Sequence, residues 1–136
     1  MIEHYSATDL IVGFFGLYLA AVSAAALMRR QMFAAIMADL REAAGLRYLA
    51  GVVAFALGAL LVSVHALWST PLQIVASLIG WLALAEGVLL IVAGRSVLRV
   101  GEPLRLHPRP IRIAMIGFLA LGVLLAGLGF LPPAAR

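Results

Sequence analysis

The chain has 136 residues, of which 65% are hydrophobic and 12% are charged. Soluble domains carry about 25% charged residues, so this composition is typical of a protein that lies in a membrane. Cysteine is absent, which excludes disulfides, thiolate metal sites and cysteine nucleophiles. Four apolar runs are long enough to cross a bilayer core of ~30 Å. We therefore predict one all-α transmembrane domain over residues 1–136, a four-helix bundle with spans at about 9–28, 48–68, 71–95 and 111–131.

The first predicted span begins with the spacing of a capping box, in which Ser6 and Asp9 satisfy each other's backbone. The residues before it include acids but no arginine or lysine, and an arginine pair follows the span. A secretory signal peptide has the opposite order of charge, so we expect a retained span with its N-terminus outside. Small residues recur on one face of this span and favour helix contact in lipid: Gly16, Ala20 and Ala24.

The basic residues decide the expected orientation. The formal net charge is +4 and all ten basic residues are arginine. Nine of the ten lie within residues 29–47 or 95–112, the two longer segments between spans. The positive-inside rule places both segments in the cytoplasm and both termini in the periplasm of a bacterial inner membrane. This distribution indicates the lipid bilayer, and not a nucleic acid, as the partner of the positive charge.

Residues 31–45 predict a short amphipathic helix at the membrane interface, between the first and second spans. Its apolar side chains fall on one helical face: Met32, Phe33, Ile36, Met37 and Leu40. Asp39, Arg41 and Glu42 fall elsewhere, as expected for a helix lying on the headgroups. A docking surface for a partner protein is the alternative.

The second and third spans carry a matched repeat of seven residues. The positions are Gly51, Gly58 and His65 in one span, and Gln73, Gly80, Gly87 and Gly94 in the next. A heptad repeat keeps one helical face toward a partner, and glycine lets two backbones approach closely. We predict an antiparallel hairpin, turning at 69–71, that places Gly58 opposite Gly80, Gly51 opposite Gly87 and His65 level with Gln73.

The third span is expected to begin at Thr70 as N-cap and to continue as helix to about Val100. Three prolines predict an extended segment over residues 101–110. The fourth span carries its own face of small residues: Gly122, Ala126 and Gly129.

Glu86 is the strongest candidate for chemistry, since it is the one acid inside a predicted span core. An acid at that depth costs roughly 2.5–3.5 kcal/mol on insertion scales, so it should face the protein interior, be paired or be protonated. Two interpretations are open. Glu86 is a proton or cation site, or it is a buried clamp that pairs with Arg112.

Two further polar residues are candidates at the outer end of the hairpin. We expect His65 to hydrogen-bond Gln73 or the turn backbone, although Gln73 also fits a capping box with Thr70. Haem ligation needs a second histidine at the same depth, and neither His4 nor His107 has that position. We therefore expect no cofactor and no metal.

Trp81 stands at mid-depth in the third span, away from the interfaces where tryptophan usually gathers. We expect it to pack inside the bundle beside Gly80.

Five positions resemble a group of small bacterial integral membrane proteins to which no activity is assigned: His65, Trp68, Gly80, Trp81 and Gly87. That group has H-x-x-W near the end of one helix and G-W-x-x-x-x-x-G in the next. The resemblance covers about a third of the chain and implies a four-helix inner-membrane protein. The chain departs from the group at Ala66 and at Glu86, where asparagine and lysine are frequent.

Three classes of function remain. The leading one is a non-enzymatic accessory or scaffold component that pairs with another protein or with a second copy. A small proton-coupled transporter using Glu86 is the alternative. A haem or quinone anchor is the third, against which the single membrane histidine argues. No nucleophile–base pair, metal cluster or phosphate loop supports an enzyme.

Overall fold

A computed structural model describes residues 6–65, 67–99 and 108–131. The helices are α1 (Ala7–Met28), α2 (Arg30–Glu42), α3 (Ala44–Val64), α4 (Pro71–Val92), α5 (Arg95–Arg99) and α7 (Pro108–Phe130). Four of them, α1, α3, α4 and α7, are long and apolar enough to cross a membrane. The predicted all-α fold with four spans is confirmed, and the described residues contain no strand.

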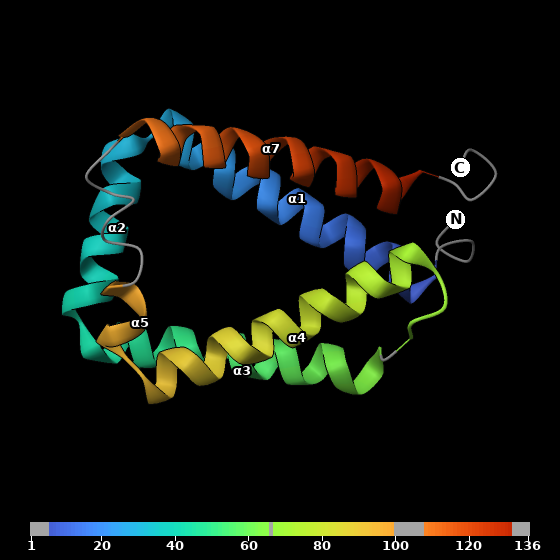
Figure 1. Cartoon of the computed structure of the whole chain (residues 1–136), viewed down its shortest axis with the longest axis horizontal. Helices are drawn as coiled ribbons and strands as arrows, with labels where there is room; N and C mark the ends of the chain where they lie inside the picture. Colours follow the sequence, from blue (N-terminus) through green and yellow to red (C-terminus); the bar gives the residue numbers. More distant parts are fainter. Residues whose placement is uncertain (1–5, 66, 100–107, 132–136) are drawn as a thin grey trace.

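The four long helices pack in two pairs. α1 lies antiparallel to α7, and α3 lies antiparallel to α4, so that two hairpins form (Figure 1). The hairpins meet at one end, where Val12 of α1, Ala76 of α4 and Leu125 of α7 form a buried cluster. At the opposite end α2 runs across the long helices and links the first hairpin to the second (Figure 1). The predicted closed bundle is therefore corrected to two hairpins that diverge from a common contact.

Small residues explain why each hairpin is tight. A Cβ at Gly16 would overlap the backbone of Gly122 and Ala126, so α1 and α7 are in backbone contact there. In the second hairpin a Cβ at Gly58 would overlap the backbone of Leu84, and one at Gly87 that of Phe55. Such close approach gains dispersion contacts that apolar lipid cannot otherwise drive. The predicted contact faces of all four spans are confirmed.

The predicted pairing of glycine with glycine is wrong by about one turn. Gly58 lies against Leu84, and Gly80 lies against Leu61 and Val62 at 3.1–3.2 Å from a built Cβ. Gly51 does reach the carbonyl oxygen of Gly87, at 3.2 Å from a built Cβ, but it lies closer to Leu90 and Ile91.

The connection between α3 and α4 accounts for this shift. α3 ends at Val64, before the predicted end at 68, and His65 is extended with φ −142° and ψ 91°. The hydroxyl of Ser77, in the second turn of α4, donates to the carbonyl of Leu67 at 2.8 Å. The connection therefore lies beside the beginning of α4, which extends past the end of α3 and contacts α1.

The starts of α1 and α4 are capped as predicted. In α1 the Asp9 amide donates to Ser6 Oγ at 3.2 Å and the Ser6 amide to Asp9 Oδ2 at 3.0 Å. In α4 the Gln73 amide donates to Thr70 Oγ1 at 3.3 Å, and Gln73 Oε1 accepts from the Thr70 amide at 3.2 Å. Each box satisfies donors that the first turn of a helix leaves open.

Two predicted boundaries near the arginine-rich segments are wrong. α4 ends at Val92, because Gly94 adopts φ +53°, a left-handed conformation that stops a helix and suits glycine. The short helix α5 then takes a new direction. α7 begins at Pro108, since proline is tolerated in a first helical turn, and the remainder of the predicted extended segment, residues 101–107, lies outside the described residues.

The predicted helix between the first two spans forms as α2. Its residues Phe33, Met37 and Leu40 are half-buried, whereas Met32 and Ile36 on the same apolar side are exposed. Its end is fixed by arginines of other elements: Arg47 donates to the carbonyls of Leu40 at 3.2 Å and Arg41 at 2.8 Å. Arg95 adds a bond to the Arg41 carbonyl at 3.3 Å. Cations suit the open carbonyls at a helix C-terminus.

Candidate functional site

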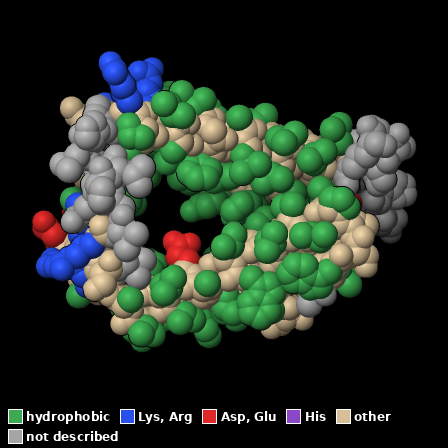
Figure 2. All heavy atoms as spheres, in the orientation of Figure 1, with side chains coloured by type: hydrophobic (Ala, Val, Ile, Leu, Met, Phe, Trp, Pro, Cys, Tyr) green, Lys and Arg blue, Asp and Glu red, His purple; other side chains and the backbone are tan. Residues whose placement is uncertain are grey.

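The two hairpins leave a cleft between them, which we call the interhairpin cleft. It contains two cavities of about 570 and 480 Å³ that share Phe15, Ile79, Ala83 and Glu86. Apolar side chains form its walls: Phe14 and Phe15 of α1, Leu57 and Leu61 of α3, and Ile79 of α4. Figure 2 shows the hollow between the hairpins with an acidic side chain beside it. A mostly apolar concave site with few polar groups is the usual form of a small-molecule site.

Glu86 is the polar centre of this cleft. Its side chain is exposed to the cleft and lines both cavities. No hydrogen bond or ion pair joins it to the described residues, and no other charged residue is among those lining the two cavities. It stands six residues before the end of α4 at Val92, which at a rise of 1.5 Å per residue is about 9 Å from that end.

Aromatic rings of α1 face Glu86 across the cleft. Phe14, Phe15 and Tyr18 line the larger cavity, and the rings of Phe15 and Tyr18 are 6.4 Å apart. Tyr18, expected from the sequence only as a filler, supplies the second polar group of this cavity. Sequence reasoning missed this wall. The available signal was the occurrence of three aromatics within five residues of the first span.

Arg112 does not accompany Glu86. It lines a different cavity, together with Arg30, between the ends of α1 and α7. The described residues contain no ion pair between Glu86 and Arg112, so the clamp is not formed in this structure.

His65 and Gln73 are likewise not brought together with Glu86. His65 is 4% exposed, its amide donates to the carbonyl of Leu61 at 2.8 Å, and its Nε2 atom has no hydrogen-bond partner in the described part of the chain. Gln73 is used by the cap of α4. His4 and His107 lie outside the described residues, within which no group of three metal-binding side chains occurs.

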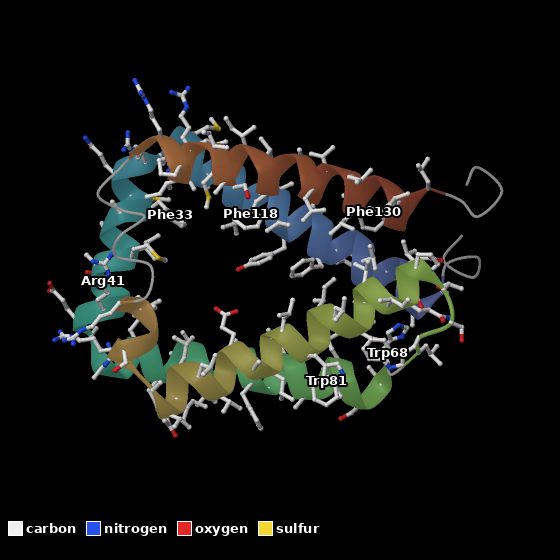
Figure 3. All side chains as sticks on the ribbon, in the orientation of Figure 1. Phe33, Arg41, Trp68, Trp81, Phe118 and Phe130 are labelled. Carbon is white, nitrogen blue, oxygen red and sulfur yellow. The ribbon has the colours of Figure 1, made fainter. Side chains whose placement is uncertain are left out.

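Trp81 is corrected. Its side chain is 49% exposed, and the space beside Gly80 is taken by Leu61 and Val62. Figure 3 shows Trp81 on the hairpin of α3 and α4, away from α1 and α7. The glycine beside it serves the helix contact, which leaves the indole on the outer surface.

The four apolar helices define a multi-pass α-helical membrane protein, with a carboxyl group in the cleft between its two hairpins. No protein-family model, curated protein or solved structure matches the chain.

Proposed function

We propose that this protein is a small, non-enzymatic proton-coupled transporter of hydrophobic organic cations, with Glu86 as the group that exchanges a proton for the cation. The observation that carries the proposal is the position of Glu86. Its carboxyl group stands without a partner among the described residues, in an apolar cleft of about 570 Å³. A cavity of this size takes a drug-sized molecule.

The charge of the site selects the ligand. A lone carboxylate in an apolar surrounding is costly, whereas a protonated carboxyl or a carboxylate paired with a cation is tolerated. The two neutral forms of the site are thus the protonated one and the cation-bound one. Rings such as those of Phe14, Phe15 and Tyr18 favour a cation held close to their faces.

The packing supports movement of one hairpin against the other. Each hairpin is held by backbone-to-backbone contact at glycine, whereas the two hairpins meet at the cluster of Val12, Ala76 and Leu125. In many transporters one such unit rocks against another around a site between them. Glu86 stands between two units of that kind.

The orientation that goes with this proposal follows from the arginines. The protein would lie in a bacterial inner membrane with both termini periplasmic. α2, with Met32 and Ile36 exposed, would lie along the cytoplasmic interface. The cleft then closes toward the periplasm and opens toward the cytoplasm.

Titration of the purified protein in detergent with tetraphenylphosphonium, a hydrophobic cation, tests the exchange. We expect saturable binding by calorimetry and release of about one proton per cation in weakly buffered solution. Glu86→Gln should abolish the binding, whereas Glu42→Gln, which alters an exposed carboxyl group at the end of α2, should leave it unchanged. Because glutamine is neutral and of similar shape, the unfolding temperature of Glu86→Gln should stay close to that of the unaltered chain.

A ring substitution gives an independent check of the cleft. Phe15→Ala should weaken binding several-fold, about 1 kcal/mol, through the lost cation–π and apolar contact. Phe118→Ala removes an exposed ring of α7 that is not among the residues lining either cavity, and should have no effect. Equal binding by Glu86→Gln and the unaltered chain would overturn the proposed site, and binding without proton release would overturn the coupling.

The second candidate is a non-enzymatic accessory or scaffold component, which the open side of the cleft favours. Leu57 and Leu82 line the cleft and are more than half exposed, so a transmembrane helix of another protein would find an apolar surface there. Purification in mild detergent followed by mass spectrometry separates the two candidates. A stoichiometric protein partner that is lost on Leu57→Trp would favour the scaffold, and a partner-free protein that binds the cation would favour the transporter.

A further inference from the structure

A second cavity, of about 410 Å³, lies where the end of α1 meets the beginning of α7. Its lining is Ala26 and Leu27 of α1, Arg30 at the start of α2, and Ile111, Arg112, Met115 and Ile116 of α7. It is far along the chain from the interhairpin cleft and shares no lining residue with it. We infer that this cavity binds the phosphate group of an anionic phospholipid, held by Arg30 and Arg112.

The charge of the cavity is uncompensated. Arg30 and Arg112 are both exposed, and neither forms a hydrogen bond or an ion pair with the described residues. No acidic residue is among those lining the cavity. The acids of α2, Asp39 and Glu42, are nine and twelve residues after Arg30, which at the helical rise is about 13–18 Å away.

The other arginines near α2 make the contrast clear. Arg47 and Arg95 spend their donors on the carbonyls at the end of α2, and so have a structural role. Arg30 and Arg112 keep their donors for a ligand. Figure 2 shows the basic side chains gathered at the α2 end of the molecule. Arg109 adds a further cation one turn before Arg112 on α7.

The shape of the site selects a lipid phosphate over a free one. A guanidinium group binds a phosphate through two parallel hydrogen bonds, so two arginines satisfy both charged oxygens of a phosphodiester. The remaining lining is apolar, and Ile116 is 51% exposed on the side of α7 that continues toward the bilayer. Acyl chains have a surface to follow there, which inorganic phosphate does not need. Basic pockets between spanning helices on the cytoplasmic side are suited to anionic headgroups.

Thermal unfolding of the delipidated protein, with added lipid, tests the inference. We expect phosphatidylglycerol to raise the unfolding temperature, and phosphatidylcholine and inorganic phosphate at the same concentration to leave it unchanged. The double variant Arg30→Gln/Arg112→Gln should bind phosphatidylglycerol about thirtyfold more weakly, since each arginine contributes roughly fivefold. Arg99→Gln removes one exposed charge at the end of α5 and should bind as the unaltered chain does.

Each other outcome has a stated meaning. Stabilisation by inorganic phosphate alone would overturn the lipid assignment, and an equal response of Arg99→Gln and the double variant would overturn the site. If the double variant does not fold, Arg30→Lys/Arg112→Lys replaces it. That variant keeps both charges but loses the paired hydrogen bonds, so it should bind with intermediate affinity. Affinity equal to that of the unaltered chain would overturn the role given to the guanidinium groups.

Discussion

Gly58→Ala should open the hairpin of α3 and α4. A Cβ at this position would overlap the backbone nitrogen and Cα of Leu84 and the carbonyl carbon of Ala83. These are backbone atoms of a regular helix, so no side-chain rotation can relieve the contact. The two helix axes must separate, and the neighbouring contacts at Gly51 and Gly87 weaken with them.

The magnitude follows from two opposing effects. Overpacking by one methyl group costs about 1–3 kcal/mol, and rigid backbone neighbours favour the upper part of that range. Alanine regains about 0.5–1 kcal/mol over glycine through its higher helix propensity. The free energy of unfolding should therefore fall by about 1–2 kcal/mol, as measured by circular dichroism during titration of the detergent-solubilised protein with sodium dodecyl sulfate.

Two glycines of α7 provide matched controls. A Cβ at Gly117 or Gly127 would meet no atom within 4 Å. Gly117→Ala and Gly127→Ala should thus stabilise the protein by about 0.5–1 kcal/mol, through propensity alone. The opposite sign at Gly58 and at these two positions is the decisive feature. A stabilising Gly58→Ala would refute the backbone contact between α3 and α4.

Two further predictions concern the outer connection and the orientation. Thr70→Ala removes the hydroxyl that accepts from the Gln73 amide and should lower the free energy of unfolding by about 1 kcal/mol in the same titration; no change would mean that the cap contributes nothing. Ser69→Cys and Ser96→Cys place thiols on exposed positions at opposite ends of α4, in a chain without cysteine. A membrane-impermeant maleimide should label Ser69→Cys in intact cells and Ser96→Cys only after permeabilisation, and the reverse result would invert the topology.

The four spans could be predicted because helix length and apolar composition are local properties. The end of α3 could not, since His65, Leu67 and Trp68 continue the apolar run beyond the last helical residue. Hydropathy does not distinguish an apolar helix from an extended apolar segment packed beside one. What decides the end is a long-range bond, from Ser77 to the Leu67 carbonyl, and a sequence pattern does not register it.

Helix pairing was partly predictable, and for a similar reason. Glycine spacing identifies which face of α3 and α4 is in contact, but a shift of one helical turn preserves that face, so the spacing alone does not fix the register. Gly80 illustrates this, since Leu61 and Val62 occupy the place expected for Gly58. The partner of α1 was open as well, because its small residues fit several glycine-bearing faces equally.

The position of the cleft follows from where small residues are absent. Within each hairpin, glycines let backbones touch, and between the hairpins Ala76 allows α4 to reach Val12 at one end. Further along, the facing positions carry Phe15 and Leu57, which hold the hairpins apart. An acid could not be buried in either glycine-lined contact without a partner, because those contacts exclude both water and space. The cleft is the one region of the described protein in which Glu86 stays inside the fold while keeping room for a proton, a cation or a polar group of a partner.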